Sequence, residues 1–131
     1  MIANLKYTSG LLAAVANKAE AAASPVRLLE AEVRAALKAA RDTRAQAQAD
    51  EARYAERRIE AVNEKSSTYF GNLEAEALAL ANRANQEVER LTMKLAQVVL
   101  KRDALESVRD RASLNADGMM DEALRLEGMA L

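Results

Sequence analysis

The stretch SSTYFGN, residues 66–72, lies between two long segments that both have a helical pattern. Its Ser and Thr hydroxyls compete for backbone hydrogen bonds and therefore disfavour a helix. Gly71 adopts a left-handed conformation at little cost, and Asn72 is a good N-cap for a following helix. The flanking segments are nearly equal in length, as the arms of an antiparallel hairpin must be. The stretch therefore predicts a hairpin turn, with a kink inside one continuous helix as the alternative.

The composition is typical of long helices. The chain has 131 residues and 50% of them are hydrophobic, but 30 are Ala and only 3% are aromatic. Ala has the highest helix propensity and buries little area. We therefore predict an all-α protein, an elongated hairpin or coiled coil that forms a single domain over residues 1–131. Residues 1–9 and 128–131 are expected to be flexible, and the thin core suggests that apolar surface is shared with other copies.

The first arm is expected to contain two helices that separate at the only Pro of the chain. A short helix is predicted over residues 10–23. Ser24 is a good N-cap and Pro25 suits the first helical position, so a long helix is predicted over residues 25–65. Large apolar side chains recur every three or four residues, except over residues 40–58, where only Ala and one Tyr continue the pattern. The predicted seam residues of this helix are Val26, Leu29, Val33, Leu37, Ile59 and Val62.

The second arm has the stronger apolar pattern and predicts a long antiparallel helix over residues 72–114. Between Leu80 and Leu91 the apolar steps sum to eleven residues, a spacing that predicts little left-handed supercoil. Residues 115–118 are turn formers that should end this helix, and a short C-terminal helix is predicted over residues 119–127. The predicted seam residues of the long helix are Leu73, Leu80, Val88, Leu91, Leu95, Val98, Leu105 and Val108.

Methionine is concentrated in the predicted C-terminal helix. Its flexible side chain fills irregular gaps in a core, and it also adapts to docking partners. The first interpretation is therefore packing against the hairpin, and the alternative is a docking tail formed by Met119, Met120 and Leu124.

Several kinds of chemistry are excluded by the residue types that the chain lacks. It has neither His nor Cys, so the usual zinc sites, the His-containing di-iron sites and the His-based catalytic arrangements cannot be built. Its four Gly residues form no phosphate-binding loop. Neighbouring carboxylates such as Asp50 and Glu51 do not share a helix face, which indicates solvated surface. We expect no enzyme activity, no catalytic residue, no metal, no cofactor and no small-molecule substrate.

The charge of the chain is balanced, with 19 basic and 20 acidic residues and a net charge of −1. The basic doublet Arg57-Arg58 is flanked by acids, which is typical of a solvated helix face. Nucleic acid is therefore not an expected partner. No apolar run is long enough to span a membrane, and the first residues do not match a cleaved signal peptide. We expect a cytoplasmic or virion-associated protein, with secretion without a cleaved signal peptide as the alternative.

Tyr69 and Phe70 are half of the aromatic residues in the chain. The first interpretation is a plug that closes the end of the hairpin, and the alternative is an anchor for a partner, since aromatic side chains contribute strongly to interfaces. The predicted turn with Tyr69, Phe70 and Gly71 resembles the turn of the secreted helical hairpins of type VII systems, which carry Trp-x-Gly. A charged hairpin without Cys also resembles the stalk proteins of flagellar and type III export ATPases. Both resemblances imply a secretion-system component, although the predicted N-terminal helix departs from the type VII pattern.

The leading function hypothesis is a non-enzymatic structural or adaptor protein. A hairpin with a narrow apolar seam fits a homo-oligomer, or a protein that docks into a bacterial or bacteriophage assembly as a scaffold, virion or tail component. The alternatives are a secretion-system component (an export stalk, an escort or a secreted hairpin) and a nucleic-acid-associated helical protein. Residues 40–58, where Ala carries the pattern, are predicted to be a place where another subunit docks or, alternatively, a locally loose part of a rod.

Overall fold

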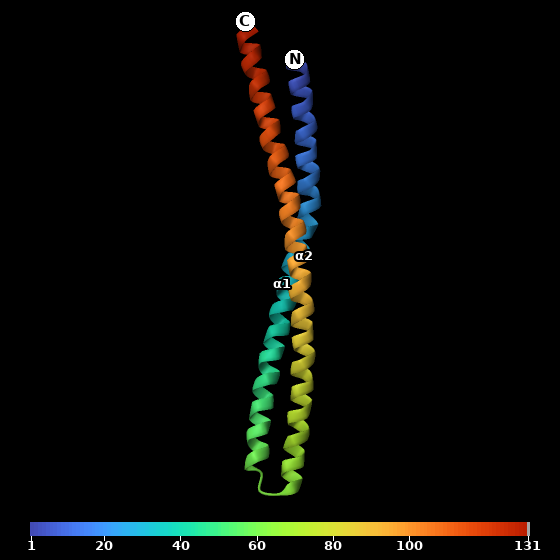
Figure 1. Ribbon diagram of the computed structural model, residues 1–131, viewed down its shortest axis with the longest axis vertical. Helices are drawn as coiled ribbons and strands as arrows, with labels where there is room; N and C mark the ends of the chain where they lie inside the picture. The colour runs from blue at the N-terminus through green and yellow to red at the C-terminus, as the bar shows by residue number, and fades with distance from the viewer. Residues whose placement is uncertain (131) are drawn as a thin grey trace. The chain divides into compact units, whose positions relative to one another are not determined.

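The computed structural model of the protein describes residues 1–130, which form two α-helices. Helix α1 is Ile2–Glu60, helix α2 is Glu64–Ala130, and residues 61–63 connect them (Figure 1). No strand occurs in the described part of the chain. The predicted all-α helical hairpin is therefore confirmed, but its turn and its helix ends lie elsewhere than predicted.

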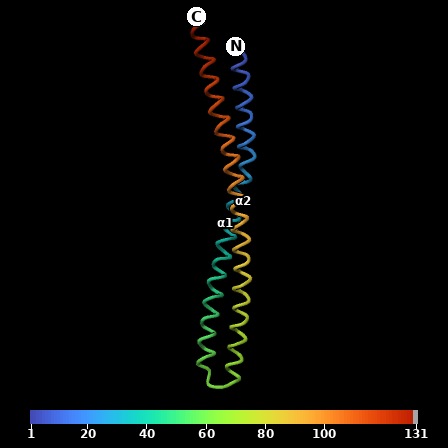
Figure 2. Tube along the Cα trace, viewed as in Figure 1, coloured from blue at the N-terminus to red at the C-terminus, as the bar shows by residue number. Residues whose placement is uncertain are grey.

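The chain reverses at residues 61–63 and not at residues 66–72 (Figure 2). Asn63 caps α2, because its Oδ1 accepts a hydrogen bond of 2.8 Å from the backbone N–H of Ser66. Glu64 follows in the first turn, where the helix dipole favours an acidic side chain. The Asn63 cap and the acidic first turn outweigh the low helix propensity of the Ser and Thr residues, so residues 66–72 belong to α2. The predicted position of the turn is therefore wrong.

Gly71 lies inside helix α2 and does not form a turn. No glycine among the described residues has a positive φ, so its backbone freedom is not used. A Cβ atom added at Gly71 would lie 3.4 Å from Cδ of Arg58. The Arg58 side chain passes over this position, and its Nε donates a hydrogen bond of 2.6 Å to Oε2 of Glu74. An added Cβ atom at this distance would make an ordinary van der Waals contact, so the ion pair between the two helices near their connection does not require a glycine here.

Helix α1 continues through Pro25, so the predicted helix over residues 10–23 is not a separate element. Proline lacks the N–H group that would bond to the carbonyl of Ala21. Both Ala21 and Pro25 are exposed, so water can reach this carbonyl and reduce the cost of the missing hydrogen bond. The predicted helix start at Pro25 is wrong for this reason.

Helix α2 continues through residues 115–118, so the predicted helix over residues 119–127 is also part of α2. Ala116 is buried, and its carbonyl accepts a hydrogen bond of 2.7 Å from Oγ of Ser9 in α1. This contact holds the segment against α1 while its turn-forming neighbours face solvent. Tertiary packing here overrides the local preference for a turn.

Both ends of the described chain are helical, including residues 2–9 and residues 128–130. The flexibility expected for residues 1–9 and 128–131 stays a prediction, and Leu131 lies outside the described residues.

The chain divides into two compact units, each made of one segment of α1 and one segment of α2. Unit 1 comprises Met1–Glu30 and Gln97–Leu131, and unit 2 comprises Ala31–Ala96. In unit 1 the first turns of α1 and the last turns of α2 lie side by side, whereas in unit 2 the two segments meet at their connection (Figure 1). The single domain predicted over the whole chain stays a prediction.

The core of unit 2 is a cluster of branched apolar side chains. Val33 and Leu37 of α1 pack with Val88 and Leu91 of α2, and none of the four is more than 7% exposed. Toward the connection the buried side chains become smaller. They are Ala47, Ala77, Ala81 and Ala84.

The buried positions of α2 in unit 2 follow a heptad spacing, with alternating steps of three and four residues. This is the 3.5-residue period of a coiled coil. Leu80, on which the eleven-residue spacing depended, is 43% exposed, so that spacing is wrong. The buried residues on either side of Leu80 are both Ala. The buried heptad positions of α2 in unit 2 are Ala77, Ala81, Ala84, Val88 and Leu91.

The core of unit 1 consists mostly of Ala. Only Val26 and Val98 are larger among its buried apolar residues, and Ser9 and Glu30 are buried polar residues. Each Ala removes little apolar area from water, so apolar burial stabilises this unit less per residue than unit 2. The buried Ala residues are Ala16, Ala19, Ala23, Ala112, Ala116 and Ala123.

Candidate interaction surfaces

Ion pairs connect the two helices in the middle of unit 1. Arg27 of α1 donates two hydrogen bonds to the carboxylate of Glu20, of 2.7 and 2.9 Å, and a third of 2.8 Å to Oε1 of Glu106 in α2. Arg109 of α2 donates to Oε2 of the same Glu20 at 2.6 Å. These side chains are about one-third to one-half exposed, so solvent screens their attraction. Their geometry nevertheless specifies which turns of the helices face each other.

The most enclosed ion pair lies next to this network. Nη1 of Arg102 is 2.6 Å from both carboxylate oxygens of Glu30, whose side chain is only 9% exposed. The same arginine also donates to Asp103 through Nη2 at 2.9 Å. A buried charge needs such partners, because burial without them is costly. We call Glu20, Arg27, Glu30, Arg102, Glu106 and Arg109 the charged cluster.

The charged cluster shifts the titration of its members. Hydrogen bonds from Arg27, and then from Arg109, lower the pKa of Glu20 from 4.5 to about 2. The hydrogen bonds that Arg102 donates to Asp103 and Glu30 raise the pKa of Arg102. Arginine is charged at every ordinary pH, so protonation of Glu20 decides when its ion pairs with Arg27 and Arg109 are lost.

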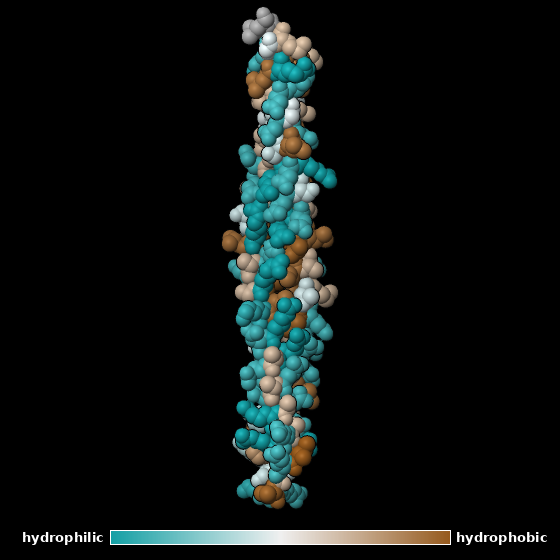
Figure 3. All heavy atoms as spheres, turned by 90° about the vertical axis from the view of Figure 1, so that its left-hand side faces the viewer, coloured by the Kyte–Doolittle hydropathy of each residue, from teal (hydrophilic) through white to brown (hydrophobic). Residues whose placement is uncertain are grey.

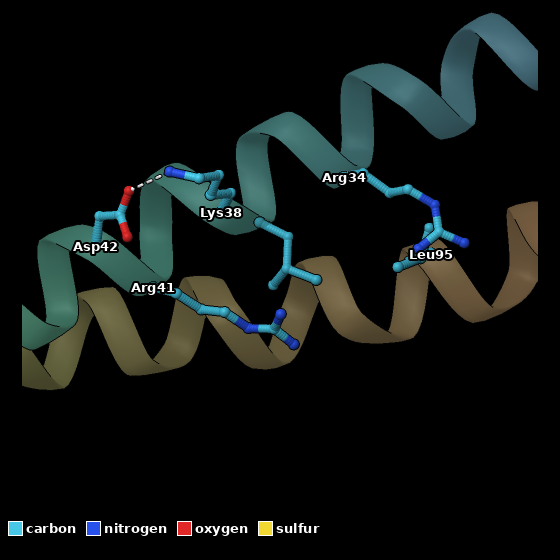
Figure 4. A pocket seen from close by; sticks show the side chains of 6 residues that line it. Arg34, Lys38, Arg41, Asp42 and Leu95 are labelled. Carbon is cyan, nitrogen blue, oxygen red and sulfur yellow. Dashed lines mark hydrogen bonds and ion pairs between the residues drawn. The ribbon is translucent and has the colours of Figure 1, made fainter.

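Unit 2 has a groove between its helices with basic side chains at its edges. It has a volume of about 310 Å³ and is lined by Arg34, Leu37, Lys38, Arg41, Asp42 and Leu95. We call it the basic groove. Figure 4 shows the guanidinium groups of Arg34 and Arg41 extending from α1 toward α2.

The polar contacts inside the basic groove are few. Lys38 Nζ lies 3.0 Å from Oδ2 of Asp42, and both side chains are at least two-thirds exposed. Arg41 makes no hydrogen bond or ion pair with any residue between 1 and 130. The groove therefore combines an apolar floor with basic side chains at its edges, of which Arg41 has no partner among residues 1–130.

The outer face of α1 in unit 1 is nearly free of charge. A second heptad stripe runs along α1 from Tyr7 to Leu28, with alternating steps of four and three residues. Lys18 is the only charged residue in this stripe. The stripe is Tyr7, Leu11, Ala14, Lys18, Ala21, Pro25 and Leu28. Tyr7 is 69% exposed and Leu28 is 66% exposed. Together with the exposed neighbours Val15 and Leu29, we call this stripe the outer face of α1.

Apolar side chains are also exposed at single positions elsewhere. Figure 3 shows one face of the molecule, on which apolar groups are scattered in small clusters among polar ones. Scattered exposed apolar residues are common on protein surfaces, whereas a periodic apolar stripe on one helix is not. The outer face of α1 is therefore the stronger candidate for an interaction surface.

The structure separates the predicted seam residues into three groups. The first group is buried between α1 and α2 and comprises Val26, Val33, Leu37, Val88, Leu91 and Val98. The second group is partly buried and comprises Leu73, Leu95 and Leu105. The third group is exposed and comprises Leu29, Ile59, Val62, Leu80 and Val108. The exposed group does not take part in the seam within the chain, and Val62, in the connection, is 94% exposed.

The aromatic pair lies inside α2, beyond the connection. The rings of Tyr69 and Phe70 meet edge to face with centroids 5.2 Å apart. The guanidinium of Arg57 in α1 lies 5.9 Å from the Phe70 ring centre. Phe70 is half-buried and Tyr69 is 60% exposed, so only Phe70 has a position suited to a plug. Because Tyr69, Phe70 and Gly71 do not form the turn, the likeness to a Trp-x-Gly turn no longer supports a type VII hairpin.

The predicted docking tail is part of unit 1. Met119 and Met120 are partly buried, and Leu124 is 54% exposed. The three residues therefore do not form one common exposed surface. Leu124 lies one helical turn beyond Asp121, and both lie on the same outer side of α2 as Asp117. Asp117, Asp121 and Leu124 are all exposed.

The predicted seam contains only large apolar side chains, so it misses the buried polar residues Ser9 and Glu30 and all the buried Ala residues. The seven-residue spacing of buried Ala is the signal that identifies the seam, since Ala16 and Ala23 are exactly one heptad apart and Glu30 follows at the next.

No protein-family model matches the chain, and no curated protein and no solved structure matches it either. Neither described helix contains a segment that is apolar and long enough to cross a membrane. Among residues 1–130, no group of three or more acidic side chains is arranged to hold a metal ion. The candidate sites are therefore the surfaces described above.

Proposed function

We propose that the protein is a non-enzymatic structural protein that assembles with other copies of itself. The observation that carries the proposal is the outer face of α1, where Tyr7, Leu11 and Leu28 are each at least half exposed. A helix that has an apolar stripe on two sides can pack against two neighbours. One side of α1 already packs against α2, and the outer face is open to a further helix.

The outer face is suited to helix packing in its residue sizes as well. Small side chains at Ala14, Ala21 and Ala22 allow close approach of a second helix, and the larger residues at both ends can fill the space where crossing helices diverge. The one cation of the stripe, Lys18, has a long apolar stem that can cover the interface while its ammonium group stays in water.

The finer parts of the proposal concern the kind of assembly. A scaffold, virion or tail component of a bacterium or bacteriophage fits the Ala-rich and Arg-rich composition. Such a protein would work in the cytoplasm or in a virion. An export stalk or escort remains the alternative proposal, and the charged hairpin without Cys is what supports it.

The test is the mass of the protein in solution at several concentrations, by light scattering after size exclusion. The chain mass is 14.2 kDa, and we expect species of at least twice this mass that increase with concentration. Leu11→Ser with Leu28→Ser should shift the distribution to the monomer without loss of helicity. Ile59→Ser with Val62→Ser is the matched control, since both residues are apolar and exposed but lie near the connection.

A monomer at every concentration would contradict the proposal. Equal effects of the two double variants would also contradict it, because the association would then depend on general surface hydrophobicity and not on the outer face of α1.

A further inference from the structure

The basic groove of unit 2 lies along a segment of α1 that has an excess of basic residues. Between residues 33 and 49 the sequence has four basic residues and one acidic residue. The four are Arg34, Lys38, Arg41 and Arg44. Three of them line the groove, and its apolar floor is formed by Leu37 and Leu95. A ligand for this groove needs negative charge and an apolar group beside it.

The same chain has a surface of that description in unit 1. Between residues 112 and 124 there are three acidic residues and no basic one. Asp117, Asp121 and Leu124 are exposed on the outer side of α2, and neither aspartate has a hydrogen-bond or ion-pair partner among residues 1–130. We call these three residues the acidic strip.

The spacing of the two surfaces agrees. Asp117 and Asp121 are four residues apart and Lys38 and Arg41 are three residues apart, so on each surface the two charged residues lie about one helical turn from each other. Leu124 lies one turn from Asp121 and would meet the apolar floor of the groove. Asp42 is the one acidic residue that lines the groove, and its carboxylate would repel the acidic strip, but it is paired with Lys38.

Another acidic pair of the chain fits less well. Glu56 and Glu60 are also one turn apart and flank the exposed Ile59. Arg57 and Arg58 lie between them in the sequence, so residues 56–60 have no net charge. The acidic strip has no such cations between its members.

From this complementarity we propose that the acidic strip of one copy docks into the basic groove of a second copy. The inference rests on the proposed self-assembly and specifies one of its contacts. The two surfaces differ, so the contact is heterologous, and each copy retains a free groove or a free strip for the next copy. Such an arrangement continues from copy to copy and forms a chain of molecules unless it closes into a ring.

The test uses charge reversal in the full-length protein. Lys38→Glu with Arg41→Glu reverses the groove, and Asp117→Lys with Asp121→Lys reverses the strip. All four residues are exposed, and Arg34 is left unchanged because it already has a contact within the chain. The control is Lys65→Glu with Arg83→Glu, which changes the net charge as the groove variant does but at exposed positions away from the groove.

We expect each reversal alone to weaken self-association by about tenfold or more, measured by sedimentation velocity over a concentration series. An equimolar mixture of the two reversed proteins should associate again, because the reversed groove of one matches the reversed strip of the other. The control should associate like the parent protein.

Unchanged association of the reversed proteins, or a mixture that fails to associate, would overturn the inference. If Leu11→Ser with Leu28→Ser still abolished association in that case, the proposed function would stand without this contact. A monomeric parent protein would remove both. If the parent bound duplex DNA at low salt and the groove variant did not, the groove would be a nucleic-acid site, and the inference would be wrong.

Discussion

Unit 2 and unit 1 use different interactions at equivalent heptad positions. In unit 2, Val33, Leu37, Val88 and Leu91 form an apolar cluster in which no residue is more than 7% exposed. In unit 1 the same positions are mostly Ala, and ion pairs cross between the helices beside them. Apolar burial stabilises in proportion to area, whereas partly exposed ion pairs contribute little but depend on exact partners. We infer that unit 2 provides most of the stability and that unit 1 depends on the charged cluster for its register.

The largest effect is expected from Leu91→Ala in unit 2. Leu91 is 4% exposed, and its removal should leave a cavity and reduce the free energy of unfolding by about 2–5 kcal/mol. Leu80→Ala is the matched control on the same helix, because Leu80 is 43% exposed and should change stability by less than about 1 kcal/mol. Urea unfolding followed by circular dichroism measures both. Equal losses in the two variants would show that the heptad seam is wrongly assigned.

Pro25→Ala should have the next largest effect, and it should stabilise unit 1. Proline in a helix interior costs up to about 3 kcal/mol relative to Ala, and exposure of Ala21 and Pro25 reduces this cost. The gain should appear as a higher urea midpoint and as slower amide exchange of residues 20–30. Ala21→Ser, an exposed change that keeps the proline, serves as the control. A loss of stability in Pro25→Ala would mean that proline is required for the geometry of α1.

These expectations show how far the sequence determines the fold. The two-arm hairpin was predictable because propensity and apolar spacing agree along both arms. The position of the turn was not, because Ser66, Thr68 and Gly71 oppose helix formation locally, whereas the Asn63 cap and the packing of Phe70 favour it. The Ser24-Pro25 pair likewise predicts a helix start that the structure does not have, because solvent exposure lets α1 continue through it.

The surfaces were less predictable than the fold. Exposed Leu and Val side chains such as Leu80 and Val108 were assigned to the seam, because a pattern built on large residues does not recognise an Ala core. The basic groove depends on which turns of α1 and α2 are adjacent in unit 2, where Val33 and Leu37 pack with Val88 and Leu91. Spacing within one helix does not contain this information.

Acid should destabilise unit 1 before unit 2. The pKa of Glu20 is lowered to about 2 in the folded protein from 4.5, so its ionised form stabilises the fold above pH 4.5. This contribution should decrease as the pH falls from 4.5 toward 2. Helicity and amide protection should therefore decline first in unit 1. Glu20→Gln should have lower stability than the parent protein at pH 7 and should lose less on acidification. Equal pH dependence of the two proteins would contradict this role of Glu20.

The smallest effect is expected from Ser9→Ala. Ser9 is 5% exposed, and its Oγ donates to the carbonyl of Ala116, so its loss should cost roughly 0.5–1.5 kcal/mol, offset in part by the better helix propensity of Ala. Ser113→Ala, at an exposed position of α2, measures the propensity gain alone. Thermal unfolding of both variants gives the difference. If Ser9→Ala were as stable as Ser113→Ala, the hydrogen bond would contribute nothing.

The most direct measurement of the difference between the units is amide hydrogen exchange along the chain, at a concentration where the protein is monomeric. We expect the slowest exchange in residues 33–40 and 88–95, around the apolar cluster of unit 2. Exchange should be faster in residues 10–24 and 112–123, where the core is Ala, and should accelerate there when salt is raised. Protection in unit 1 that equals or exceeds protection in unit 2, independent of salt, would contradict the account.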